Sequence, residues 1–464
     1  MATGPGGKSI AFALSGGGHR ATLFTLGALM YAVDAGRGRD TTSIASVSGG
    51  SITNGCVAQA VDFRDVSREA FERAVAGPLA ARVAREGTLF AAWQTWAYLA
   101  ALLLGFAGAV VVPWMLALPL PLRIVALVLL LAAWGWLLGQ RGNICALAFR
   151  KTLFSPGGRA SLLTVAARSL THVFCATELR TAASVYFAGD FVYAFAFGPG
   201  RPGKLPLYRA VQASAAFPGG FPPSRLLFAE HEFAGPPGSP EVPRAVSQLI
   251  LTDGGVYDNM GEEWARGFAA RAKRWAWLAE HKPAPDQVVV VNASARRPWT
   301  PFRWGRIPLV GEIAAFLRVN DMMYVNTTTT RRQRLVDSWD PVEHTVGDGV
   351  PTALVQIAQT PYRVADAFAR AAGTPVGQRA ASVLGALGDD AKHRASWEDI
   401  ATSNAAVATT LSALGTEVAA RLLYQGYVVA MCNLHVLFGD EEAGHAWPLL
   451  AMPTLERFRR LAGG

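Results

Sequence analysis

The chain has 464 residues and a formal net charge of +9, with 43 Lys and Arg against 34 Asp and Glu. This length suits two or three domain-sized units, or one large domain with insertions. No clustered nucleic-acid motif accompanies the basic balance, so we take the charge as compatible with anionic lipid surfaces and expect no nucleic-acid partner. The four cysteines lack the paired spacing of a zinc site, which favours structural thiols in a reducing compartment.

Two strand–turn–helix units follow each other near the N-terminus. The apolar run Ile10–Leu14 predicts a buried strand that leads into Gly16–Gly18 and then into a helix over residues 19–35. A second short run, Ser43–Val47, predicts another strand that ends at the Ser48 turn, and a further helical pattern follows it. The first unit offers a glycine turn and the second offers a serine flanked by glycine.

This pair of turns suits ester hydrolysis, which needs a nucleophile and a place to hold the oxyanion. A serine on a sharp strand-to-helix turn is exposed and needs small neighbours, and Gly49 meets that need for Ser48. Glycines can present consecutive backbone N–H groups, so Gly16, Gly17 and Gly18 at a helix N-terminus suit an anion or an oxyanion.

The glycine turn has other interpretations. Glycine-rich turns between strand and helix are common in α/β proteins, so the turn alone establishes no function. Gly16, Gly18 and Ala21 also match a loose dinucleotide-binding fingerprint. That hypothesis needs an acidic residue at the end of the next strand, and here the strand ends at Ser48, which counts against it.

The largest change in composition follows. No charged residue occurs from Gly87 to Leu122, and Ile124–Gln140 is again uncharged after Arg123. A helix that crosses a bilayer needs roughly 20 apolar residues, with about 17 as a lower limit. We therefore expect two membrane spans, near Ala92–Leu116 and Leu122–Leu138. The alternative, a helical hairpin buried in a soluble core, is disfavoured because such helices rarely lack a polar stripe.

The flanks of this hairpin are more basic than its turn, where Arg123 is alone. Because two spans form a hairpin, both flanks lie on one side of the membrane. The positive-inside rule places them in the cytoplasm, and the catalytic part with them. The flanking cations are Arg82, Arg85, Arg141, Arg150 and Lys151.

After the hairpin, short apolar runs alternate with helical patterns, which indicates a mostly parallel sheet. Strands are expected over Thr171–Thr177, Ser184–Ala188, Phe191–Phe195, Gln248–Leu251 and Gln287–Val291, and helices over Leu207–Phe217 and Glu262–His281. We expect residues 1–90 and 141–300 to form one α/β catalytic domain that the hairpin, residues 91–140, interrupts.

Residues 301–464 are expected to form a mainly helical C-terminal region. It has one strand near Ala353–Ile357 and a long helix around Ala405–Leu437. A helical stretch, Thr327–Leu335, carries Arg331, Arg332 and Arg334. A solvated face is the simpler interpretation of these arginines, and contact with lipid phosphate is the more specific one.

Ser48 needs a proton acceptor, and the usual partner is histidine. None of the eight histidines sits in a Gly/Asp-rich turn, and His19, beside the glycine turn, suits a local role. Asp253 is the better candidate because it ends a strand and two glycines follow it. A carboxylate at the C-terminal edge of a strand belongs at the mouth of an open α/β sheet. Its alternative role is that of an Asx-type turn residue.

Taken together, these motifs resemble the patatin-like phospholipases, over about residues 8–295. The motifs are SGGGHR at 15–20, SVSGG at 46–50, ATELRTAASVYF at 176–187, AVQASAAFPGGFPP at 210–223 and DGG at 253–255. The SGGGHRA form is also similar to the cytosolic phospholipase A2 branch of that superfamily. The resemblance implies an α/β three-layer sandwich around a mostly parallel sheet, and a lipid acyl hydrolase with a Ser–Asp dyad and no catalytic histidine.

Carried over by position, the resemblance makes Ser48 the nucleophile and Asp253 the base. Gly17 and Gly18 would supply the oxyanion-hole N–H groups, with Gly16 shaping the turn. No metal or cofactor is implied.

Arg20 matches the family's basic residue after the glycines and would steady the loop or meet lipid phosphate, and Gly49 would also face the substrate. This sequence departs from the family at Ser46 and Ala21, where glycines are usual.

The sequence thus predicts a membrane-anchored serine acyl hydrolase that acts on phospholipid or lysophospholipid in the bilayer. Two alternatives stay open. One is a non-catalytic membrane scaffold with the same fold. The other is an α/β-hydrolase-type esterase that uses His435 or His445, although that fold usually places its nucleophile after a later strand than Ser48 does.

Overall fold

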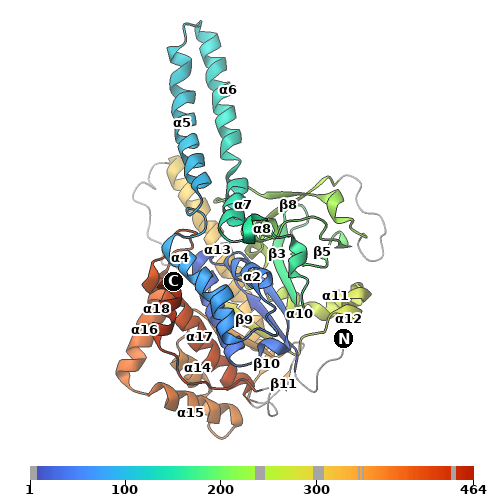
Figure 1. Ribbon diagram of the computed structural model, residues 1–464, viewed down its shortest axis with the longest axis vertical. Helices are drawn as coiled ribbons and strands as arrows, with labels where there is room; N and C mark the ends of the chain where they lie inside the picture. Colours follow the sequence, from blue (N-terminus) through green and yellow to red (C-terminus); the bar gives the residue numbers. More distant parts are fainter. Residues whose placement is uncertain are drawn as a thin grey trace.

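The computed structural model describes residues 8–235, 246–295, 308–342, 345–346, 350–439 and 446–463 (Figure 1). A body of helices around a sheet carries a long hairpin, formed by α5 (Trp93–Met115) and α6 (Leu120–Leu138), which stands away from it. The N-terminal and C-terminal parts of the chain both belong to the body, because α1 (Gly18–Asp34) packs against α17 (Thr416–Phe438) and the Phe12 ring contacts the Trp447 ring.

The central sheet is mixed, with ten strands in the order β12-β9-β1-β2-β3-β4-β5-β6, and β8 joins β3 to β7. Its first five strands in that order are parallel to one another, and the others pair antiparallel. The strands are β1 Ile10–Leu14, β2 Thr41–Ser46, β3 Thr171–Glu178, β4 Ala183–Phe187, β5 Val192–Ala194, β6 Gly198–Gly200, β7 Ser224–Leu227, β8 Gln248–Asp253, β9 Gln287–Asn292 and β12 Thr352–Gln356. The α/β fold expected from the sequence is confirmed.

Helices cover both faces of the sheet, because the strand side chains alternate between two apolar cores. In β1, Ile10, Phe12 and Leu14 face one core, and Ala11 and Ala13 face another. The first face packs against α1 (Gly18–Asp34), α2 (Gly49–Ala60), α8 (Leu207–Ser214) and α17 (Thr416–Phe438), and the second against α10 (Glu263–Arg266) and α11 (Phe268–Arg274).

The register of the central strands brings the candidate turns together. Leu14, the last residue of β1, pairs with Ser46, the last residue of β2. The glycine turn after β1 and the Ser48 turn after β2 therefore leave the sheet side by side. Asp253, at the end of β8, pairs with Ala176 of β3, which is the neighbour of β2.

The direction of β8 differs from the expectation for Asp253. We expected the carboxylate at the C-terminal edge of a strand in a mostly parallel sheet, and β8 runs antiparallel to β3. β8 therefore begins outside the C-terminal edge of the parallel strands and runs back toward it. Asp253, its last residue, lies at that edge. Strand direction is set by the connections between elements and leaves no mark on the local apolar pattern.

The C-terminal region is mainly helical, as expected, but it is not separate from the sheet. Its strand β12 pairs with β9 at the sheet edge, and α17 packs along α1. The remaining helices are α3 Arg68–Phe71, α4 Gly77–Arg85, α7 Arg141–Thr152, α9 Gly255–Asp258, α12 Ala276–His281, α13 Pro308–Asp337, α14 Pro361–Phe368, α15 Pro375–Leu387, α16 Ala391–Ala406 and α18 Leu455–Gly463.

Two predicted helices are interrupted. The expected helix Ala405–Leu437 is wrong over its first part, because α16 ends at Ala406 and α17 begins only at Thr416. Gly415, which precedes α17, has a φ of 81°, a left-handed conformation that a right-handed helix cannot contain. The expected helix Glu262–His281 is split into α10, α11 and α12.

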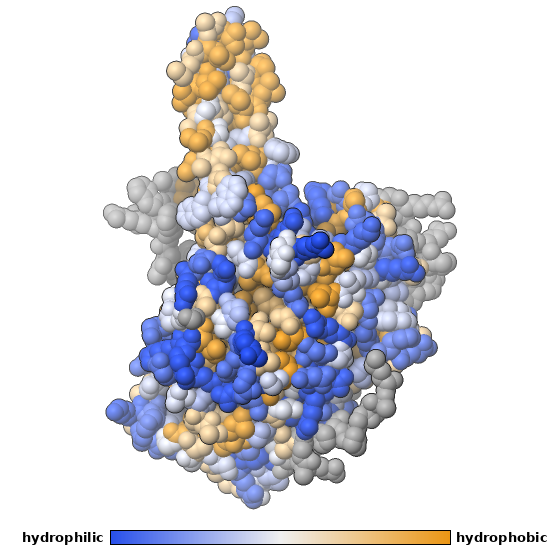
Figure 2. All heavy atoms as spheres, in the orientation of Figure 1, coloured by the Kyte–Doolittle hydropathy of each residue, from blue (hydrophilic) through white to orange (hydrophobic). Residues whose placement is uncertain are grey.

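The hairpin helices are apolar and exposed, and in Figure 2 they form a hydrophobic column above the body. The structure buries no residue of α6, and Leu103 of α5 is 75% exposed. The two helices bond to each other, since the Trp134 indole N–H donates to the Leu102 carbonyl at 2.9 Å. The alternative of a hairpin buried in a soluble core is wrong. By length and composition, both helices could cross a membrane.

Candidate active site

The glycine turn follows β1 and opens α1. Gly17 and Gly18 have φ values of 140° and 58°, which L side chains rarely adopt, so glycine is required here. The amide of Gly16 donates to the carbonyl of Asn259 at 3.0 Å. Among the described residues, the amides of Gly17 and Gly18 have no hydrogen-bond acceptor. The turn therefore offers two N–H groups at a helix N-terminus, while the N–H of Gly16 holds the turn in place.

Ser48 lies on a strained turn between β2 and α2. Its φ of 50° and ψ of −115° are unusual for a residue with a side chain, and such strain is typical of an exposed nucleophile. Its amide donates to the carbonyl of Ser214 at 3.2 Å. The neighbouring glycines have no room for a side chain: a Cβ on Gly49 would overlap the carbonyl oxygen of Gly18, and one on Gly50 would lie 2.6 Å from the Leu14 carbonyl.

A buried hydroxyl network supports this turn. The Ser51 hydroxyl lies 3.0 Å from that of Ser46 and 2.8 Å from that of Ser214, and the Ser46 hydroxyl donates to the Val173 carbonyl of β3. The departure from glycine at position 46 thus adds bonds between the turn and the sheet. Sequence reasoning missed Ser51 and Ser214, although a serine-rich stretch beside the motif was a visible signal.

Asp253 is buried beside Ser48. Its Oδ1 accepts the amide of Gly255 at 2.8 Å, and the Ser48 hydroxyl is close enough to act on the pKa of the carboxyl group. Burial raises the pKa of Asp253 from 3.8 to about 7, although the Gly255 amide and the Ser48 hydroxyl act in the opposite direction. A carboxyl group with a pKa near neutrality can accept a proton from a hydroxyl and return it, as a general base must.

Asn259 connects the glycine turn with the Asp253 turn, and the sequence analysis did not identify this role. Its backbone carbonyl accepts the Gly16 amide, and its side-chain N–H donates to the Ser294 hydroxyl at 2.7 Å. Its Oδ1 would clash with a Cβ at Gly16, and a Cβ at Gly255 would lie 2.6 Å from it. Asn259 therefore fixes the distance between the two turns.

His19 has a local role, as expected. Its Nε2 lies 2.9 Å from the Thr88 hydroxyl and its Nδ1 lies 2.8 Å from the Ser412 carbonyl. Burial lowers its pKa to about 4, so the ring is neutral at physiological pH. The amide of His19 also donates to the carbonyl of Thr410 at 2.9 Å, so residues 407–415, between α16 and α17, lie over the start of α1.

Arg20 is bound to the C-terminal region. It is 3% exposed, and its Nη1 donates to the carbonyls of Val407 at 2.7 Å and Ala405 at 3.2 Å. These bonds match the loop-steadying role among the two that the sequence suggested. Contact of Arg20 with lipid phosphate stays a prediction, as does substrate binding by Gly49.

A cavity of about 480 Å³ contains Ser48, Asp253 and the glycine turn. The C-terminal region completes it with Arg318, Tyr324 and Thr410. The apolar part of its wall consists of Ile52, Leu89, Phe90, Phe217, Phe221 and Leu411. Leu89 and Phe90 shortly precede α5, so the cavity reaches the base of the hairpin.

No histidine of the described ranges lines this cavity. His435, one of the two late histidines considered, lies on α17 and its Nδ1 lies 2.9 Å from the Trp447 carbonyl. His445 lies outside the described residues. The geometry therefore lends the histidine-dependent alternative no support.

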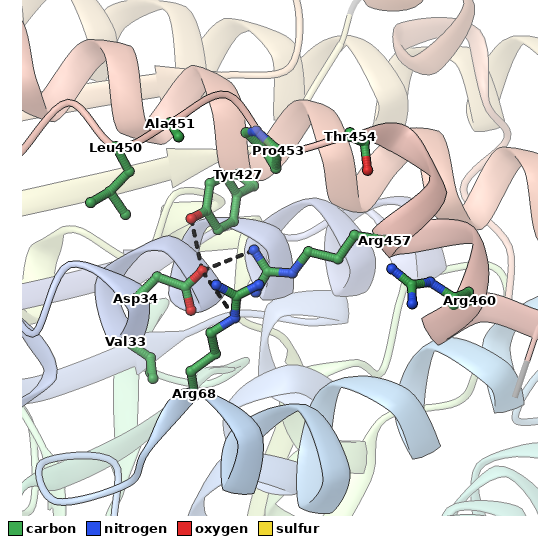
Figure 3. A pocket seen from close by; sticks show the side chains of 10 residues that line it. All are labelled: Val33, Asp34, Arg68, Tyr427, Leu450, Ala451, Pro453, Thr454, Arg457 and Arg460. Carbon is green, nitrogen blue, oxygen red and sulfur yellow. Dashed lines mark hydrogen bonds and ion pairs between the residues drawn. The ribbon is translucent and has the colours of Figure 1, made fainter.

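A second cavity, of about 530 Å³, lies at the C-terminal end of α1 (Figure 3). Figure 3 shows Tyr427, Arg68 and Arg457 turned toward Asp34. Asp34 accepts the Tyr427 hydroxyl at 2.8 Å and pairs with Arg457 at 2.9 Å. These side chains are hydrogen-bonded or ion-paired with one another. The wall of the second cavity therefore contains an ion-pair cluster that joins α1, α3, α17 and α18.

Comparison with known proteins bears on the first cavity. A family model described as "Patatin-like phospholipase" matches residues 12–265, more than half of the chain. No curated protein matches the chain. Among solved structures, VipD from Legionella pneumophila aligns over 76% of this chain and 62% of its own, with 13% identity and a TM-score of 0.29. The chain thus spans less than two thirds of VipD.

Proposed function

Because the chain belongs to the patatin-like phospholipase family, we propose that it is a serine acyl hydrolase that cleaves fatty-acyl esters of membrane lipids. One observation carries the proposal. Ser48 and the buried carboxyl group of Asp253 line the same cavity as Gly17 and Gly18, whose amides have no acceptor among the described residues.

In the proposed mechanism, Asp253 accepts the proton of Ser48 while the Ser48 oxygen attacks the ester carbonyl carbon. The amides of Gly17 and Gly18 stabilise the oxyanion of the tetrahedral intermediate. The leaving alcohol takes the proton back from Asp253, and an acyl-enzyme remains. Water then attacks that ester with Asp253 again as base, which releases the fatty acid and restores the Ser48 hydroxyl.

The hairpin supports a membrane-anchored enzyme. Its helices expose apolar side chains along their length, and the basic residues of its flanks, Arg141 among them, lie where it joins the body. We place the body on the cytoplasmic side by the positive-inside rule. Because Leu89 and Phe90 belong to both the cavity wall and the start of the hairpin, a phospholipid or lysophospholipid in the bilayer would reach Ser48 over a short path.

The experiment that tests the chemistry is fatty-acid release from phosphatidylcholine and lysophosphatidylcholine by purified full-length protein in detergent. Ser48→Ala and Asp253→Asn should each lower kcat/KM by about 10⁴-fold or more, the range seen when a member of a catalytic triad is removed. Ser382→Ala is the matched control, because Ser382 is exposed on α15.

Full activity of either variant would show that the dyad is wrong. A wild-type protein that releases no fatty acid would favour the non-catalytic scaffold.

The anchoring is tested by labelling with a membrane-impermeant maleimide in intact cells. Leu118→Cys, in the turn between α5 and α6, should react from outside, whereas Ser382→Cys on the body should react only after permeabilisation. Extraction of the protein from membranes by alkaline carbonate, or the reverse labelling pattern, would contradict the proposed topology.

A further inference from the structure

The wall of the Ser48 cavity contains charged residues as well as apolar ones. Among the described residues, Arg20, Asp253 and Arg318 are the charged groups that line it. Asp253 is the proposed base, and Arg20 donates to the carbonyls of Ala405 and Val407. Arg318 belongs to α13, which follows the motifs at residues 15–255 in the chain. None of those motifs includes Arg318.

Contacts of two residues of α13, Tyr324 and Arg331, hold this helix beside Ser48 and Asp253. The Tyr324 ring packs on Phe217, with ring centroids 5.7 Å apart, and both residues line the cavity. A Cβ on Gly255 would lie 2.7 Å from the Tyr324 ring and 3.0 Å from Asp253 Oδ1. Tyr324 therefore lies directly beside the turn that holds the proposed base.

The second fixed point is Arg331, whose guanidinium donates to Glu262 at 2.9 Å and to Glu263 at 3.2 Å. The sequence analysis favoured a solvated face for this arginine, which is wrong for Arg331, whereas Arg332 and Arg334 are exposed. The ion pairs hold the C-terminal half of α13 against α10, and so fix the direction in which the helix leaves the site.

Arg318 then lies within one lipid molecule's reach of Ser48. It precedes Tyr324 by six residues, which is about 9 Å along a helix axis. A glycerophospholipid carries its acyl ester and its phosphate only a few bonds apart on the same glycerol. Since Ser48 and Arg318 line the same cavity, a lipid with its ester at Ser48 has its phosphate in or near the cavity that Arg318 lines.

The surroundings of Arg318 suit an amphipathic ligand. Phe316 and Val319, which are close to it in sequence, are 65% and 54% exposed, so this stretch of α13 presents apolar side chains as well as a cation. In Figure 1, α13 extends toward the same end of the molecule as the hairpin. A phosphate that enters a partly apolar site loses hydration, and the planar guanidinium compensates with paired, charge-assisted hydrogen bonds.

We propose that Arg318 binds the phosphate of the lipid whose ester lies at Ser48, and thereby selects phospholipids and lysophospholipids over neutral glycerides. This inference rests on the proposed function and names the substrate class of the same site. Arg318 is a specificity-determining residue in this account, since it touches a part of the substrate that does not react.

The test compares lysophosphatidylcholine with a monoacylglycerol of the same acyl chain, both in mixed micelles. Arg318→Ala should lower kcat/KM for the lysophospholipid at least tenfold, mainly by raising KM, and change that for the monoacylglycerol less than twofold. Arg318→Lys should restore part of the loss. Arg334→Ala, an exposed arginine of the same helix, should change neither.

Three results would overturn the inference: a wild-type enzyme without preference for the lysophospholipid, equal losses on both substrates in Arg318→Ala, or no loss on either. Competition by inorganic phosphate without any lipid preference would assign the site to free phosphate and also overturn it. Ser48→Ala separates this failure from failure of the proposed function, because it should abolish hydrolysis of both lipids.

Discussion

Two cavities of this protein each contain an aspartate whose side chain is largely enclosed, and the surroundings of the two carboxyl groups differ. Asp34 is enclosed by Arg457, Arg68 and the Tyr427 hydroxyl (Figure 3). Asp253 accepts a hydrogen bond from the Gly255 amide and lies beside Ser48, and no Lys or Arg of the described residues forms an ion pair with it.

Because of this difference, we expect Asp34 to stabilise the fold and Asp253 to take part in the reaction. A carboxylate surrounded by cationic partners links the elements that supply those partners. A buried carboxyl without such a partner has a raised pKa, which favours proton transfer and costs stability wherever the group ionises. The variants below should therefore affect activity at the Asp253 cavity and stability at the Asp34 cavity.

After the Ser48 and Asp253 variants, the largest effect is expected from Gly49→Ala. The new methyl group would overlap the carbonyl of Gly18 and displace the glycine turn from Ser48. Loss of oxyanion stabilisation should lower kcat by about 10²–10³-fold. Gly385→Ala is the control, because a Cβ there meets no neighbouring atom. Steady-state hydrolysis of a soluble p-nitrophenyl ester measures both variants, and an active Gly49→Ala would argue against the role of this turn.

The pH dependence of activity should follow Asp253. Because its pKa is raised to about 7 and the proposed base must be deprotonated, kcat/KM should fall about tenfold per pH unit below that value. The profile is measured from pH 5 to pH 9 with the same ester. A flat profile across this range would mean that Asp253 is not the titrating base.

The same carboxyl should lower stability as the pH rises. Below pH 3.8 it is protonated in both states. As the pH rises toward 7, it ionises in the unfolded chain first, so folding loses on the order of 2–4 kcal/mol over this interval. Asp253→Asn should lack this loss and be more stable than wild type at pH 8. Urea unfolding in detergent at pH 5 and pH 8 tests the difference, and equal pH dependence of the two proteins would contradict it.

The smallest effect on chemistry is expected from Arg457→Ala in the second cavity. The change leaves Asp34 and Glu72 without a main cationic partner, which should destabilise the fold by about 2 kcal/mol, since the pair is partly exposed. The kcat per folded molecule should not change. An Arg457→Ala protein that unfolds like wild type but has lost activity would show that the second cavity takes part in the reaction.

Local patterns predicted much of the site. The strand Ile10–Leu14, the glycine turn and the Ser48 turn could be located because each has a signature within a few residues. Asp253 could be singled out by its position between an apolar run and two glycines. The hairpin helices end within two residues of the predicted spans, because an uncharged stretch of this length has few other structures.

Long-range contacts could not be predicted in the same way. Asn259 bonds to the glycine turn across more than two hundred residues, and nothing in its local sequence indicates that contact. Thr410 covers the start of α1 because a helix expected to be continuous is broken at residues 407–415. The antiparallel direction of β8 likewise follows from the sheet as a whole.

The most direct test of the Ser48–Asp253 dyad is covalent labelling with a fluorophosphonate, followed by mass spectrometry of the peptides. We predict an adduct on Ser48 in the wild-type protein, no adduct at this position in Ser48→Ala, and strongly slowed labelling in Asp253→Asn. An adduct on a different serine, or labelling of Asp253→Asn at the wild-type rate, would contradict the account.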